Sequence, residues 1–158
     1  MVEIGLIVAR FLHYAATTIL AGLSFFPLYA YIDGEPEALR HWRRKWFTRT
    51  SVAVLVSGLC WFAFAAANMS GDISDLADAE TLEAVAGGTS FGILWTLRML
   101  LAALTVGVAG WCLRSRKTAR HCNLVMALLA GLLLVSLAGT GHTQIEEGWR
   151  GVIHVISD

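Results

Sequence analysis

Four long apolar runs dominate this chain, and short polar segments separate them. The runs span Phe11 to Ile32, Thr50 to Gly71, Ala84 to Leu113 and Cys122 to Ile145. None of them contains Asp, Glu, Lys or Arg, except the third, which Arg98 interrupts. The runs lack the regular polar face of a soluble amphipathic helix. Because roughly 20 apolar residues cross a bilayer, the pattern predicts four transmembrane helices at about 4–32, 47–68, 90–113 and 121–140.

The connections between these runs are short, which favours antiparallel neighbours in an up-down bundle. After residue 150 the sequence "GVIHVISD" becomes apolar again, as the opening of a fifth helix from about 151. We therefore expect an all-α, polytopic membrane protein: a single transmembrane domain over residues 1–158, with a truncated fifth segment. The link before the third run is expected to contain a short surface helix.

Composition supports the membrane assignment. Of the 158 residues, 56% are hydrophobic and only 15% are charged, against about 25% charged in soluble domains. The formal net charge is zero, so nothing draws the chain to nucleic acid. The N-terminus has no basic region and carries Glu3, so we expect the first helix to remain as an anchor and not to be cleaved as a signal peptide.

Local charge predicts the orientation of the chain. Lys and Arg gather in the links at 33–46 and 114–120, whereas the link at 69–89 holds five carboxylates and no basic residue. Basic residues in short loops mark the cytoplasmic side. We therefore predict a membrane protein whose basic links lie in the cytoplasm and whose N-terminus and acidic link lie outside, with the bilayer as its first partner.

The three cysteines are Cys60, Cys112 and Cys122, and no two have the CxxC spacing. Cys112 and Cys122 flank a link that we expect in the cytoplasm, where thiols stay reduced. We therefore expect no structural disulfide and no cysteine-based zinc site.

Polar side chains at membrane depth are the candidate functional residues. They gather toward the side of the membrane that we expect to face outside: Arg10, His13, Asn68, Met69, Arg98, His142 and His154. On a helical projection Arg10, His13 and Thr17 share one face of the first helix. Because charges are costly inside the membrane, such groups are expected to face the bundle interior.

Each of these residues also has an ordinary structural explanation. Arg10 and Arg98 can extend to the headgroups, and His13 can be a packing residue bonded to Thr17 or a carbonyl. His142 can belong to a turn, while His154 and Met69 can be interfacial. Their shared depth favours a joint site over any one of them taken alone.

Histidine and methionine at this depth indicate copper, because imidazole and thioether ligands suit that metal. The predicted ligands are His13, His142, His154 and Met69, with Arg10, Arg98, Asn68 and Thr17 as polar support. No Ser-His-Asp order, HExxH or phosphate-binding glycine loop is present, so we do not expect an enzyme.

Three stretches carry a family resemblance: "RFLHYAATTILAGLSFF", "GGTSFGILWTLRMLLA", and "SLAGTGHTQ" followed by "GVIHVISD". In this order they resemble the CopD family of bacterial inner-membrane copper-resistance proteins. The resemblance implies a permease-like protein that moves copper between periplasm and cytoplasm, with a periplasmic copper-binding partner of the CopC type. It also places His13, Arg98, His142 and His154 at the family's polar signatures.

Members of that family are longer, so we expect this chain to be the first half of a longer protein or to depend on a homo-oligomer. Two other functions remain open. A b-type haem could sit between facing histidines, with Arg10 or Arg98 at its propionates. A ligand-free assembly subunit would instead use small residues such as Gly22, Gly58 and Gly131 for close helix contacts.

Overall fold

The computed structural model describes residues 2–31, 35–114 and 119–138, and within these the chain is all-α without a strand. The long helices are α1 (Val2–Ala30), α2 (Glu37–Ser70), α4 (Ser90–Arg114) and α5 (Ala119–Ala138). A short 3-10 helix, η1 (Ile73–Ala77), and the helix α3 (Ala79–Gly88) connect α2 to α4. The predicted fifth segment from about 151 lies outside the described residues.

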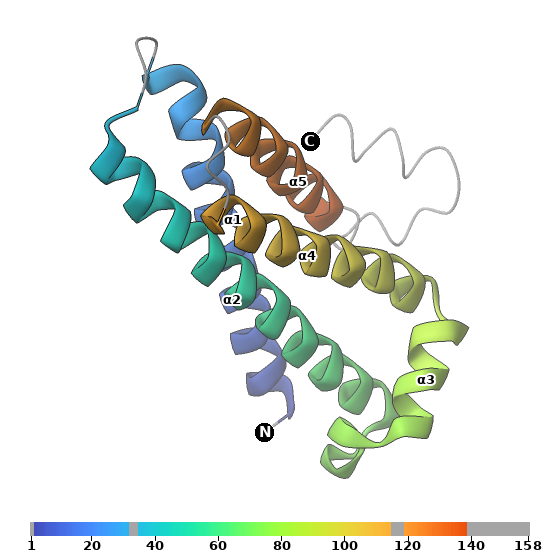
Figure 1. Cartoon of the computed structure of the whole chain (residues 1–158). Helices are drawn as coiled ribbons and strands as arrows, with labels where there is room; N and C mark the ends of the chain where they lie inside the picture. Colours follow the sequence, from blue (N-terminus) through green and yellow to red (C-terminus); the bar gives the residue numbers. More distant parts are fainter. Residues whose placement is uncertain (1, 32–34, 115–118, 139–158) are drawn as a thin grey trace.

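Successive long helices run antiparallel, as Figure 1 shows. Helix α1 packs against α2 and α5, and α4 packs against the same two helices. The four helices therefore surround one core, with α1 and α4 diagonally opposite each other. Any polar contact between α1 and α4 must cross the centre of this arrangement.

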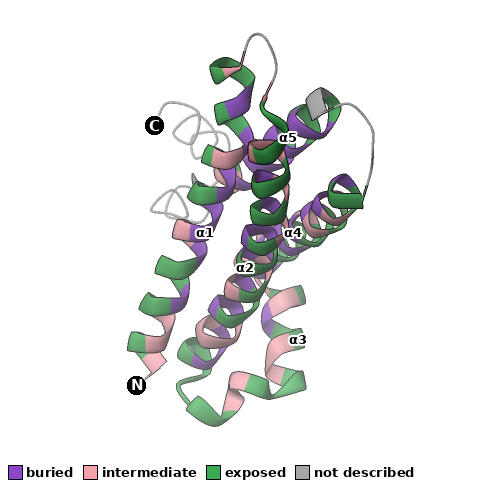
Figure 2. Ribbon diagram, turned by 60° about the vertical axis from the view of Figure 1, so that its left-hand side comes forward, coloured by how far each residue is buried: buried purple, intermediate pink, exposed green. Residues whose placement is uncertain are grey.

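Three described helices, α1, α2 and α4, are long and apolar enough to cross a membrane. The apolar part of α5 is shorter, from His121 to Leu137. The expectation of four spanning helices is thus matched for three of them within the described residues. Large apolar side chains such as Ile4, Phe11 and Leu100 are exposed, and the exposed faces in Figure 2 lie on the outside of the helices.

Helix α2 begins at Glu37, well before the expected start near 47. The basic residues that we expected in the link form its first turns. Pro36 precedes it, a position where the missing amide hydrogen is not needed. Within these turns Arg43 is buried, forms an ion pair with Glu35 and donates to Asn123 Oδ1 at 2.9 Å. This contact ties the start of α2 to α5.

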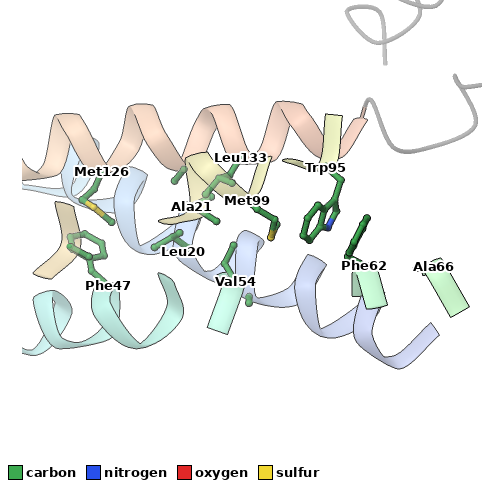
Figure 3. Close-up of a cluster of buried hydrophobic side chains, with 14 of the residues drawn as sticks. Leu20, Ala21, Phe47, Val54, Phe62, Ala66, Trp95, Met99, Met126 and Leu133 are labelled. Atoms are coloured by element: carbon green, nitrogen blue, oxygen red, sulfur yellow. The ribbon is translucent and has the colours of Figure 1, made fainter. Parts of the chain in front are cut away.

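The core is a continuous column of apolar side chains along the bundle. Figure 3 shows it running from Met126 and Phe47, past Leu20 and Val54, to Trp95 and Phe62. The rings of Phe62 and Trp95 stack with centroids 3.9 Å apart. This column fixes α2 against α4 on both sides of the polar residues described below.

The expected surface helix is confirmed, and side chains cap it and its neighbours. Asp72 accepts from the Ser74 amide at 2.9 Å and begins η1, and Asp78 accepts from the Thr81 amide at 2.8 Å and begins α3. The Thr89 hydroxyl accepts from the Gly92 amide at the start of α4. Such caps satisfy amides that a helix start leaves without partners.

The expectation of no structural disulfide is wrong for one pair. Cys112 and Cys122 form a disulfide, with Cα atoms 5.9 Å apart, inside the usual range for such bonds. The two cysteines flank the link of the α4–α5 hairpin, which brings them together; the expectation failed because it rested on a reducing cytoplasm and not on the distance between them. Cys60 is free and exposed.

Candidate functional site

His13 lies on the inner face of α1 and is completely buried. Its Nδ1 is 3.0 Å from the Val54 carbonyl oxygen and 3.1 Å from Ser57 Oγ, both on α2. Its Nε2 accepts from Arg98 Nε at 2.9 Å. A carbonyl can only accept and a guanidinium can only donate. The imidazole is therefore neutral, with its proton on Nδ1, and both of its nitrogens are engaged.

Arg98 comes from α4 and is 1% exposed. Besides bonding His13, it donates through Nη1 to the Leu133 carbonyl at 2.8 Å and to the Ser136 hydroxyl on α5. Within the described residues it has no carboxylate partner, and its Nη2 has no hydrogen-bond partner. Arg98 is thus a buried cation stabilised by neutral acceptors, and its Nη2 can donate to a further acceptor.

Together these contacts join all four long helices. His13 and Arg98 link α1 to α4 across the diagonal, Ser57 and Val54 belong to α2, and Ser136 belongs to α5. We call His13, Arg98, Ser57 and Ser136 the central polar cluster. A cation in such a place is costly unless its hydrogen bonds are satisfied, so the cluster constrains how the four helices pack.

Trp61 forms one wall of the cluster. It is buried, and its ring centroid lies 5.5 Å from that of His13. The Arg10 guanidinium lies over the same Trp61 ring, 5.3 Å from its centroid. Arg10 itself is exposed and makes a cation–π contact with Trp61, the wall of the cluster.

Thr17 is buried as expected, but its hydroxyl donates to the His13 carbonyl at 2.8 Å and not to the imidazole. Its contribution is local to α1, where a threonine commonly bonds one turn back. The His13 ring is instead held by the neighbouring helix. Of the two structural partners expected for His13, the carbonyl is the one that bonds its ring.

Gly58 on α2 leaves room for the side chains of His13 and Met99. A Cβ at this position would lie 2.8 Å from Met99 Sδ and 3.1 Å from His13 Cε1. Met99 is buried on α4 beside Arg98, so its thioether and the imidazole pack against the same point of α2. The sequence analysis missed Met99 because a methionine inside an apolar run is usually a core residue. Only its position next to Arg98 indicated that it could lie near the polar residues.

Asn68 and Met69 are not brought to this cluster. Both are exposed at the end of α2, and Met69 is 58% exposed. Ser57 contacts His13, and Met69 lies roughly 18 Å further along the helix axis. His142 and His154 lie outside the described residues.

The other described histidines, His41 and His121, are exposed near the basic ends of α2 and α5. Among described residues no group of three or more His, Cys, Asp or Glu side chains could hold a metal ion. A groove of about 770 Å³ lies between α1 and α2. Its lining includes Ser57 and Cys60 but neither His13 nor Arg98.

The acidic link contributes charge at the far end of α2. Hydrogen bonds from the Ser74 and Thr81 backbone amides hold the pKa of Asp72 and of Asp78 below the usual carboxyl range. Both carboxylates are exposed and ionised at neutral pH. They form a negative surface beside Met69 that attracts cations.

Comparison with known proteins identifies a family. Residues 1–152 match the family model described as "Copper resistance protein D-like, N-terminal domain". The chain is 30% identical over 154 residues to Copper resistance protein D of Pseudomonas syringae pv. tomato, covering 96% of this chain and 48% of that protein.

The chain thus spans about half the length of the curated relative that it matches. No solved structure matches it. With the family model covering nearly every residue, this membrane protein belongs to the copper resistance protein D-like family.

Proposed function

We propose that this chain takes part in the movement of copper between the periplasm and the cytoplasm of a bacterium. Two findings support the proposal: membership of a copper-resistance family and a polar cluster buried among helices long enough to span a bilayer. The observation that carries it is the His13–Arg98 pair. A neutral imidazole at the centre of a membrane bundle is a ligand suited to copper.

In the arrangement described, Arg98 holds the Nε2 lone pair that a copper ion would need. Binding at His13 therefore requires Arg98 to release that nitrogen. The released ligands would be the imidazole and the adjacent Met99 thioether, a soft donor that favours Cu(I). As described, the central polar cluster is closed to copper, because the Arg98 guanidinium occupies the Nε2 lone pair of His13. Copper would compete with the guanidinium for that lone pair.

We propose the inner membrane as the location, with the N-terminus in the periplasm. The basic ends of α2 and α5 then lie in the cytoplasm, and α5 makes a fourth crossing. The acidic link between α2 and α4 would gather copper at the periplasmic surface, near Met69. His142 and His154 remain predicted ligands on the same side.

The remaining parts of the proposal concern partners. A periplasmic copper-binding protein of the CopC type would deliver or receive the ion at the acidic surface. A homo-oligomer, or the additional length seen in the curated relative, would complete the pathway. We propose a role in transport, with no catalytic step.

The haem alternative has no specific observation in its favour. His13 Nε2 is engaged by Arg98, and the other described histidines are exposed at the basic helix ends. The described residues therefore offer no second axial ligand beside His13. A Soret band on the purified protein would nevertheless reverse this preference.

Copper affinity of purified variants tests the proposal. We expect His13→Ala and His142→Ala each to weaken copper binding several-fold, measured by competition with a chromophoric chelator. His41→Ala, which removes an exposed histidine, serves as the matched control and should bind as the parent does. Unchanged affinity in both His13→Ala and His142→Ala would eliminate the proposed site.

A further inference from the structure

The Cys112–Cys122 pair lies at the opposite end of α4 from the acidic link. Cys112 is 0% exposed in the last turns of α4, and Cys122 is 1% exposed in the first turn of α5. Their sulfur atoms are bonded, and their Cα atoms are 5.9 Å apart. Two buried sulfur atoms are therefore held face to face, and neither belongs to the central polar cluster.

The link between them contains Arg114, Arg116, Lys117 and Arg120, and no acidic residue. By the charge rule this end of the molecule faces the cytoplasm. Thiols there are kept reduced by low-molecular-weight thiols. Such a reductant converts the disulfide to two thiols by supplying two electrons and two protons, and is itself oxidised to its own disulfide.

We propose that the reduced pair is a Cu(I) site, with one ion held by the two cysteine sulfurs at the cytoplasmic end of the bundle. This inference rests on the proposed function and adds a second copper-binding site to it. Two thiols lose two protons as they bind one Cu(I), which leaves a complex of charge −1. Arg114, two residues after Cys112, carries the opposite charge.

The choice of Cu(I) follows from the ligands. Thiolates select soft ions, and structural zinc sites require four ligands, whereas described residues provide no cluster of three or more. Cu(I) is stable with two thiolates. Met126 is buried one turn beyond Cys122 on the same face of α5, and its thioether is a further donor of the same soft kind.

The backbone spacing allows the pair to change from a disulfide to two sulfurs around one Cu(I). A metal–sulfur bond is about 2.3 Å, so the two sulfurs must separate to roughly 4.6 Å around one ion. Rotation about the Cα–Cβ bonds provides this separation, with the Cα atoms 5.9 Å apart. The helices need not move apart.

The test measures Cu(I) stoichiometry under anaerobic conditions in detergent. All samples carry Cys60→Ser, because Cys60 is a free, exposed thiol. The reduced parent should bind one more Cu(I) per chain than the Cys112→Ser/Cys122→Ser variant, in competition with a chromophoric Cu(I) chelator. X-ray absorption should show copper–sulfur scattering that the variant lacks.

A second comparison requires no substitution at the pair. Oxidising the parent to the disulfide with diamide should remove the same single equivalent, and a phosphine reductant should restore it. Equal stoichiometry in oxidised and reduced parent would overturn the inference. The same conclusion follows if the double variant binds as much Cu(I) as the parent.

Failure of this inference is distinguishable from failure of the proposed function. If binding depends on His13 but not on the cysteines, the thiol site is refuted and copper handling stands. If neither the parent nor any variant binds copper, both are refuted. If binding depends on the cysteines but not on His13 or His142, the thiol site stands without the histidine site.

Discussion

At the scale of single residues, the central fact is that His13 has no free nitrogen. Val54 and Ser57 engage one side of the ring, and Arg98 engages the other. Removing either His13 or Arg98 leaves a buried polar group without its partner, which typically costs about 1–3 kcal/mol. The effects of substituting the two residues on the free energy of unfolding should therefore be coupled.

A double-mutant cycle measures this coupling. We predict that His13→Ala and Arg98→Ala each lower the free energy of unfolding, and that their effects are non-additive by about 0.5–3 kcal/mol. Denaturant unfolding in detergent provides the values. The control cycle pairs His13→Ala with Arg114→Ala, a distant arginine at the other end of α4, and should be additive; an additive result for Arg98 as well would contradict the direct bond.

Gly58 provides a second test at this scale. A methyl group there would lie 2.5 Å from Met99 Cε and 3.1 Å from His13 Cε1. Because both neighbours are buried, we predict that Gly58→Ala lowers the free energy of unfolding by about 1–3 kcal/mol, as overpacked cores do.

The matched control for that test is Gly22→Ala. A Cβ at Gly22 has no neighbour within 4 Å, so this variant should be no less stable than the parent, and the helix propensity of Ala should raise its free energy of unfolding by about 0.5–1 kcal/mol. Thermal unfolding of the two variants and the parent gives the comparison. Equal stabilities for Gly58→Ala and the parent would show that Met99 and His13 do not pack against this point.

At the scale of elements, the acidic link depends on side-chain caps. Asp78 accepts from the Thr81 amide at the start of α3, and this hydrogen bond lowers the pKa of the Asp78 carboxyl below its ordinary value of 3.8. Since the folded-state pKa is the lower one, the stabilisation is complete above the ordinary value. It is lost as the pH falls through the lowered pKa.

We therefore predict that α3 loosens on acidification below the ordinary carboxyl range. Hydrogen exchange of residues 79–88, corrected for the intrinsic pH dependence, would show the change. Asp78→Ala should exchange faster at neutral pH, whereas Asp78→Asn keeps a cap and should lose the acid dependence. An unchanged exchange rate in Asp78→Ala would exclude a capping role.

At the scale of the whole molecule, the bundle separates two chemical ends. Carboxylates occupy the link between α2 and α4, and basic side chains occupy the opposite ends. Between them lie the central polar cluster and the apolar column around it. This separation of charge supports the proposed orientation, in which the basic links lie in the cytoplasm.

Cysteine labelling tests the orientation. In a Cys60→Ser background we predict that Ser74→Cys, in the exposed acidic link, reacts with a membrane-impermeant maleimide in intact spheroplasts. Lys45→Cys, exposed at the basic end of α2, should react only after lysis. The reverse pattern would place the N-terminus in the cytoplasm and invert both proposed copper sites.

Much of this organisation is readable without coordinates. The apolar runs predicted an all-α membrane protein, and the quoted stretches indicated the family. The expectation that polar groups at membrane depth face the bundle interior is confirmed for His13, Thr17 and Arg98, which are buried, and is wrong for Arg10, which is exposed. Each depends on local periodicity or on composition, which a sequence carries directly. The surface helix was predictable for the same reason, although the prediction did not single out its cap, Asp78.

Tertiary structure decided which of those inward residues meet. Arg98 reaches His13 only because α1 and α4 are diagonal neighbours in the bundle, and Met69 lies away from them because α2 continues well past the cluster. The disulfide likewise depends on the α4–α5 hairpin. Sequence determined the apolar character of the long helices and the inward faces of several polar residues; pairing across the bundle depends on packing between distant segments, which no local pattern encodes.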